Sequence, residues 1–125
     1  MSKILLVEDD RFLIKAVYTK LTQKGFEVVL ANDGDEAISK AKTEKPEIVL
    51  LDMVLPKKSG FEVLRELKGN PETASIPVFI LSNLAQDQDI QEGKALGAED
   101  YIVKSNTSLS AIVDKVANFL ATKKT

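Results

Sequence analysis

Charged and hydroxyl side chains stand directly after four apolar, strand-like segments of the sequence. The first segment is followed by Glu8-Asp9-Asp10, the third by Asp52, the fourth by Ser82 and the fifth by Lys104. If the strands lie parallel in one sheet, their carboxyl ends meet at one edge, and these side chains converge there. The sequence therefore predicts an acidic edge that also carries a lysine.

Such a collection of carboxylates requires a counter-charge. Two carboxylates about 4 Å apart repel each other by about 4 kcal/mol at an effective dielectric constant of about 20. A raised carboxyl pKa, the Lys104 ammonium or a divalent cation would each offset this repulsion. The chain contains neither histidine nor cysteine. Oxygen ligands alone suit a hard cation, and a shallow edge with few ligands suits Mg²⁺.

The same absences narrow the choice of nucleophile to a carboxylate or Ser82. A serine needs a general base, and the chain has no imidazole to act as one. An ionised carboxylate needs only relief of charge. Asp52 is therefore the expected nucleophile toward an activated phosphorus, once Mg²⁺ and Lys104 neutralise the incoming oxygens. The metal, Lys104 and the Ser82 hydroxyl would bind the resulting acyl phosphate.

Five short and largely β-branched segments are the candidate strands: Ile4–Val7, Glu27–Ala31, Ile48–Leu51, Pro77–Leu81 and Tyr101–Val103. Most of them are apolar at every position, which is typical of strands buried on both faces of a parallel sheet. Asn32 and Asp33, after the second segment, are interpreted as the N-cap of the next helix.

Helical patterns separate these strands. Apolar residues recur at helix spacing over residues 13–21, 37–41, 61–67 and 109–120, and a more polar stretch covers 84–96. Ser59 and Glu62 have the spacing of a capping box. Alternating strands and helices predict an α/β fold: a doubly wound, five-stranded parallel sheet in the order 2-1-3-4-5, flavodoxin-like, with helices on both faces.

The composition favours a single soluble domain over residues 1–125. A formal net charge of -2 gives no reason to expect nucleic acid or a membrane surface as the partner. No apolar run approaches the roughly 20 residues of a membrane helix, and the N-terminus does not resemble a signal peptide. We expect a cytoplasmic protein without membrane insertion, whose last helix ends near Ala121 and is followed by no output domain.

The order of the edge residues resembles the receiver domain of bacterial two-component response regulators, of the CheY type. The matching residues are Glu8-Asp9 after strand one, Asp52 after strand three, Ser82 after strand four and Tyr101-x-x-Lys104 in strand five. The resemblance covers essentially the whole chain. It implies a phosphorelay switch that accepts a phosphoryl group on Asp52 from a histidine kinase, a phosphotransfer protein or a small acyl phosphate. Such a domain catalyses only its own phosphorylation and dephosphorylation.

The resemblance also implies roles for the other edge residues. Mg²⁺ would be held by Glu8, Asp9, Asp52 and the backbone carbonyl of Val54. Lys104 would contact the phosphoryl group. Ser82 and Tyr101 would couple phosphorylation to a surface change around the fourth helix and fifth strand, and a downstream protein would bind that surface. Asp10 lies outside the acidic pair and is expected to face solvent or to start the first helix.

Two positions depart from the pattern that is usual in this family. Ser105 follows the lysine, where proline with a cis bond is common. A cis bond before serine would cost about 2.5–4 kcal/mol, so a trans peptide and a remodelled loop are expected. Asn83 replaces the small residue that usually follows Ser82, and its bulk is expected to affect access to the hydroxyl or closure of the loop.

Two further positions bear on the lifetime of a phosphorylated form. In receivers, the residues two positions beyond the acceptor aspartate and beyond the serine or threonine orient or exclude the hydrolytic water. Here they are Val54 and Leu84. Neither side chain can hydrogen-bond an attacking water, so a long-lived phosphorylated form is expected.

Three other interpretations remain open. A flavin-binding protein of the same fold would need a phosphate-binding loop after strand one, where Glu8-Asp9-Asp10 would repel a phosphate. A phosphatase like the haloacid-dehalogenase enzymes would need its nucleophile after strand one and a cap domain, for which the chain has no room. A degenerate receiver, which docks partners without being phosphorylated, would be consistent with Ser105 and Asn83.

Overall fold

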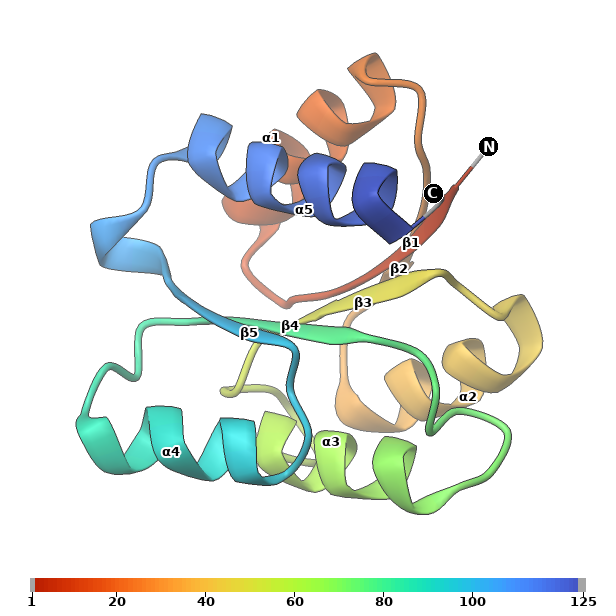
Figure 1. Cartoon of the computed structure of the whole chain (residues 1–125), viewed down its shortest axis with the longest axis vertical. Helices are drawn as coiled ribbons and strands as arrows, with labels where there is room; N and C mark the ends of the chain where they lie inside the picture. Colours follow the sequence, from red (N-terminus) through yellow and green to blue (C-terminus); the bar gives the residue numbers. More distant parts are fainter. Residues whose placement is uncertain (1, 124–125) are drawn as a thin grey trace.

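The computed structural model describes residues 2–123, which form a five-stranded parallel sheet with helices on both faces (Figure 1). In chain order the elements are β1 (Lys3–Val7), α1 (Arg11–Gln23), β2 (Glu27–Ala31), α2 (Gly34–Glu44), β3 (Ile48–Leu51), α3 (Gly60–Gly69), β4 (Val78–Ser82), α4 (Asp87–Ala95), β5 (Asp100–Val103), a 3-10 turn η1 (Lys104–Asn106) and α5 (Leu109–Lys123). The strand order is β2-β1-β3-β4-β5, which confirms the predicted doubly wound α/β fold.

Two hydrophobic cores lie on opposite faces of the sheet. Helices α1 and α5 cover one face, and α2, α3 and α4 cover the other (Figure 1). Successive side chains of each strand point to opposite faces of the sheet, so alternate residues pack into the two cores. In β1, Ile4 and Leu6 belong to the core under α1 and α5, whereas Leu5 and Val7 belong to the core under α2 and α3. Every residue of β3 and β4 is buried, as their apolar runs predict.

Short polar side chains fix where three of the helices begin. The Asp10 carboxylate accepts hydrogen bonds from two backbone amides in the first turn of α1, at 2.9 and 3.2 Å. Asp33 accepts one from the first turn of α2 at 2.8 Å, and Ser59 Oγ accepts one from the first turn of α3 at 3.2 Å. These bonds satisfy amides that have no partner inside the helix. The predicted helix-starting roles of Asp10, Asp33 and Ser59 are confirmed.

Several predicted boundaries are wrong by a few residues. The fourth strand runs from Val78 to Ser82 instead of over Pro77–Leu81, because proline has no N–H for the ladder and Ser82 pairs with Val103 of β5. β1 and β5 each begin one residue earlier than predicted. The polar stretch 84–96 contains the shorter helix α4, which begins only after Gln86.

The last helix, α5, is described as far as Lys123, two residues beyond the predicted end near Ala121. Within residues 2–123, no helix combines the length and the apolar character that crossing a bilayer requires. Every peptide bond in the same range is trans, so the expected trans bond between Lys104 and Ser105 is confirmed.

Candidate functional site

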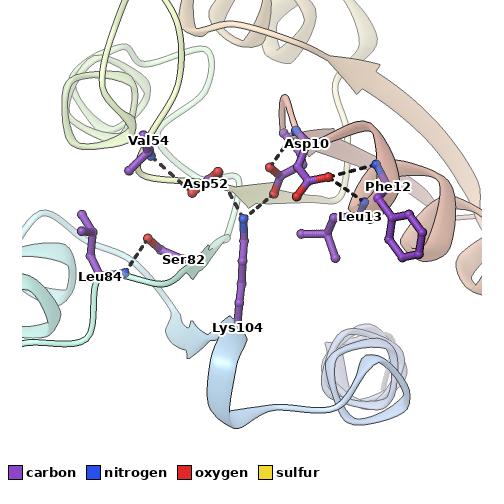
Figure 2. A network of polar contacts seen from close by, with 9 residues as sticks. Asp10, Phe12, Leu13, Asp52, Val54, Ser82, Leu84 and Lys104 are labelled. Carbon is purple, nitrogen blue, oxygen red and sulfur yellow. Dashed lines mark hydrogen bonds and ion pairs between the residues drawn. The ribbon is translucent and has the colours of Figure 1, made fainter.

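The carboxyl ends of four strands meet at one edge of the sheet, where the predicted site residues converge (Figure 2). Glu8 directly follows β1 and Asp52 directly follows β3, while Ser82 is the last residue of β4 and Lys104 follows β5. Three of these polar residues are almost fully buried: Glu8 is 1% exposed, Asp52 6% and Ser82 0%. The predicted convergence at this edge of the sheet is therefore present.

Glu8, Asp9 and Asp52 form a cluster of carboxylates. One oxygen atom from each residue lies within 4.8 Å of the corresponding atoms of the other two. Glu8 and Asp52 are buried, whereas Asp9 is exposed, so Asp9 is the member of the cluster that solvent reaches. All the donor atoms of this cluster are oxygens.

The Lys104 ammonium neutralises part of this negative charge. Its Nζ lies 2.8 Å from Glu8 Oε1 and 3.2 Å from Asp52 Oδ2. Burial raises the pKa of Glu8 above its usual value; Lys104 opposes this rise, and the charge of Asp52 adds to it. Burial acts to lower the pKa of Lys104, but its interactions with the two carboxylates outweigh burial and raise that pKa. Lys104 is therefore a cation at neutral pH.

Buried Glu8 Oε1 faces the Lys104 ammonium at 2.8 Å and has no other hydrogen-bond partner among residues 2–123. The Val54 amide donates to Asp52 Oδ1 at 3.3 Å (Figure 2), and the Val54 carbonyl oxygen accepts no hydrogen bond from residues 2–123. Carboxylate and carbonyl oxygens are the ligands of Mg²⁺, so the residues present fit this ion.

Ser82 and Tyr101 are joined through the backbone of one residue. The Leu84 amide donates a hydrogen bond to Ser82 Oγ at 3.1 Å (Figure 2), and the Tyr101 hydroxyl donates to the Leu84 carbonyl oxygen at 2.6 Å. Tyr101 is 9% exposed, and burial raises the pKa of its hydroxyl. The two predicted switch residues therefore hold the same point of the loop between β4 and α4.

The loop after β5 accommodates Ser105 while Lys104 Nζ lies within 3.2 Å of both Glu8 Oε1 and Asp52 Oδ2. Lys104, Ser105 and Asn106 form the 3-10 turn η1, and the Thr107 amide donates to the Lys104 carbonyl oxygen at 3.4 Å. The Asn83 side chain is exposed. The Ser82 hydroxyl is thus fully buried beside an exposed asparagine.

The backbone of Leu84 and two glycines, Gly34 and Gly60, were not identified from the sequence. The link between Ser82 and Tyr101 uses the backbone amide and carbonyl groups of Leu84. Every residue except proline has both groups, so the residue type at position 84 does not predict this link. The sequence places Gly60 directly after the Ser59 cap, but local helix-start preferences do not require glycine at that position, so its close approach to the acceptor loop was not predicted.

The sequence was compared with protein-family models and with known proteins. The sequence model of the family described as "Response regulator receiver domain" matches residues 4–117. The chain is 37% identical over 102 residues to the alkaline phosphatase synthesis transcriptional regulatory protein PhoP of Bacillus subtilis, across 82% of this chain and 42% of PhoP. It therefore spans less than half the length of that relative. It is 36% identical over 104 residues to protein PilH of Pseudomonas aeruginosa, across 83% of this chain and 86% of PilH.

Solved structures of similar shape include the Mn²⁺-bound form of response regulator Rcp1. It superposes with a TM-score of 0.84 and 30% sequence identity, across 96% of this chain and 94% of Rcp1.

Proposed function

Because the chain belongs to the response regulator receiver domain family of two-component systems, we propose that it is a phosphoryl-accepting switch whose acceptor is Asp52. The donor is a phosphohistidine on a histidine kinase or phosphotransfer protein, or a small acyl phosphate, and the transfer depends on Mg²⁺. The observation that carries this proposal is the position of Lys104 Nζ, within 3.2 Å of Asp52 Oδ2 and 2.8 Å of Glu8 Oε1.

The transfer requires a nucleophile and a leaving group. A carboxylate oxygen of Asp52 forms a bond to phosphorus while the P–N bond of the phosphohistidine, or the P–O bond of the acyl phosphate, breaks. The donor imidazole or carboxylate leaves with the bonding electrons. Asp52 needs no general base, because its attacking oxygen carries no proton when ionised.

The metal would be held by the carboxylates of Glu8, Asp9 and Asp52 and by the Val54 carbonyl oxygen. When bound, Mg²⁺ supplies positive charge for the phosphoryl oxygens. The carboxylate cluster and the unbonded Val54 carbonyl support this assignment. The Mn²⁺ in the similar response regulator Rcp1 is consistent with a divalent cation here.

The remaining residues bind the phosphoryl group and transmit its presence. Lys104 turns from the carboxylates toward a phosphoryl oxygen, and the Ser82 hydroxyl donates its proton in a hydrogen bond to another. Movement of Ser82 would pull the Leu84 backbone, and Tyr101 would follow because its hydroxyl is bonded there. The surface around α4 and β5 would then change, and a downstream protein would bind it. We place this receiver domain in the cytoplasm, and the partners that we propose for it are proteins.

Intact-mass spectrometry after incubation with acetyl phosphate tests the proposal. One added phosphoryl group should appear with Mg²⁺ and should be absent with EDTA and in Asp52→Asn. The second candidate is a degenerate receiver that only docks partners, and Ser105 and Asn83 are the residues that favour it. Absence of any adduct, together with no binding of beryllofluoride and Mg²⁺, would favour this second candidate.

A further inference from the structure

The loop that carries the acceptor, residues 52–58, lies against the first turns of two helices. The amide of Gly60, the first residue of α3, donates to the Met53 carbonyl oxygen at 2.9 Å. The amide of Gly34, the first residue of α2, donates to the Pro56 carbonyl oxygen at 3.4 Å. Amides at helix starts have no partner within the helix. Both helices therefore use such an amide to hold the acceptor loop.

Gly60 approaches the loop more closely than any other residue type would allow. A Cβ at this position would overlap the Asp52 carbonyl oxygen and would lie 2.5 Å from Met53 Cα. Both are backbone atoms, which cannot turn away as the end of a side chain can. Any residue other than glycine must therefore displace the backbone of Asp52 and Met53 or shift the start of α3.

Gly34 makes a similar but more distant contact. A Cβ there would lie 2.6 Å from Lys58 Cβ and 3.1 Å from the Lys58 carbonyl oxygen. Lys58 is six residues beyond the acceptor, so a displacement at this point acts on the far end of the loop.

The two contacts lie on either side of the Val54 carbonyl group. The Met53 carbonyl oxygen accepts from Gly60, and the Pro56 carbonyl oxygen accepts from Gly34 and, at 2.8 Å, from the Lys58 amide. The Val54 and Leu55 carbonyl oxygens between them accept no hydrogen bond from residues 2–123. We propose that Gly60, assisted by Gly34, is a positioning residue that holds the loop so that the Val54 carbonyl and the Asp52 carboxylate face the metal together. This inference rests on the proposed function, because it concerns the same Mg²⁺ site.

Three glycine-to-alanine variants form a matched series for the test. Gly69 ends α3, and a Cβ added there would meet no atom within 4 Å, so Gly69→Ala is the control for the substitution itself. Mg²⁺ affinity of each purified variant is measured by isothermal titration calorimetry. Gly60→Ala should weaken Mg²⁺ binding by about 10-fold or more, the effect of removing a group that orients metal ligands. Gly34→Ala should weaken it less, and Gly69→Ala should leave it unchanged.

Urea unfolding of the metal-free variants separates positioning from general stability. A positioning role requires that Gly60→Ala unfold cooperatively and still lose Mg²⁺ affinity. If Gly60→Ala does not fold, ¹⁵N NMR of the unsubstituted protein tests the positioning role instead. The Gly60 amide is bonded to the acceptor loop, so its chemical shift should change together with that of the Val54 amide on titration with Mg²⁺. The chemical shift of the Gly69 amide should not change.

The outcomes distinguish this inference from the proposed function. If the unsubstituted protein does not bind Mg²⁺, the proposed function fails. If it binds Mg²⁺ and a folded Gly60→Ala binds equally well, the positioning role is overturned. A Gly60 amide that stays still while the Val54 amide shifts would overturn it as well.

Discussion

The Tyr101 hydroxyl donates a 2.6 Å hydrogen bond to the carbonyl oxygen of Leu84, a residue 17 positions earlier in the chain. The amide of the same Leu84 is bonded to Ser82 Oγ at 3.1 Å. The buried serine at the end of β4 and a tyrosine of β5 are thereby connected through one residue of the intervening loop.

Removing this hydroxyl should weaken the connection without disabling the acceptor. Tyr101→Phe should lower the free energy of unfolding by about 0.5–1.5 kcal/mol, the net contribution of one hydrogen bond. Phosphorylation by acetyl phosphate, followed by intact mass, should proceed at nearly the same rate. Tyr18→Phe is the matched control, because the Tyr18 side chain is exposed. Complete loss of phosphorylation in Tyr101→Phe would contradict a role limited to transmission.

The stability of the metal-free protein should depend on pH through Glu8. Burial raises its pKa, so the unfolded carboxyl ionises first as pH rises. The stability contribution of protonated Glu8 is therefore fully present below the unfolded pKa and is lost as pH rises through the folded one. Glu8→Gln should raise the melting temperature in EDTA at pH 7, and this gain should shrink toward pH 4.

The exposed Glu72 provides a control for this substitution, since Glu72→Gln should show no comparable gain. Added Mg²⁺ should stabilise the unsubstituted protein but not Glu8→Gln, which lacks one metal ligand. A Glu8→Gln protein that is less stable than the unsubstituted protein at pH 7 without metal would show that the Lys104 ion pair outweighs the cost of burying the carboxylate.

Lys104 and the metal should compete as counter-charges for the same carboxylates. Lys104→Met leaves Glu8 and Asp52 facing each other without a cation, and breaking a buried pair costs about 3–5 kcal/mol. The loss should be smaller here, because the Lys104 side chain is 16% exposed. The increase in melting temperature caused by Mg²⁺ should be larger in Lys104→Met than in the unsubstituted protein.

The matched control for this prediction is Lys24→Met. Lys24 pairs with Asp114 at 3.7 Å on the surface, where both side chains are about half exposed. Its removal should change stability by at most about 1 kcal/mol and leave the effect of Mg²⁺ unaltered. An equal Mg²⁺ effect in all three proteins would mean that Lys104 does not offset the carboxylate charge.

The phosphorylated form should decay slowly, because the side chains that flank the acceptor are apolar. Val54 and Leu84 are exposed beside Asp52 and Ser82, and neither can hydrogen-bond a water (Figure 2). Val54→Asn combined with Leu84→Glu should accelerate loss of the phosphoryl group, followed by intact mass after removal of acetyl phosphate. The apolar pair Val54→Ile and Leu84→Met serves as the control. Equal decay in all three proteins would refute the assignment of lifetime to these side chains.

The fold and the convergence of the main site residues could be predicted, because both follow from strand patterning. The apolar run Ile48–Leu51 requires burial on both faces, and a parallel sheet then brings the ends of its strands together. Asp52 and Lys104 meet for that reason, although 52 residues separate them.

Other features depend on backbone contacts that the residue types do not reveal. The inclusion of Ser82 in β4 follows from its pairing with Val103, and the link between Ser82 and Tyr101 runs through the peptide groups of Leu84. The close approach of Gly60 to the acceptor loop depends on how α3 packs, which local propensity does not determine.

The backbone and the side chain of Leu84 have separate roles. Its amide and carbonyl groups connect Ser82 to Tyr101, while its side chain points away from Ser82 (Figure 2) and is exposed. Under the proposed function, substitutions at position 84 should therefore change the lifetime of phosphorylated Asp52, while the hydrogen bonds that join Ser82 to Tyr101 through the Leu84 backbone are kept. A series of variants that differ only in this side chain should therefore differ in the half-life of the phosphorylated form and share the same surface around α4 and β5.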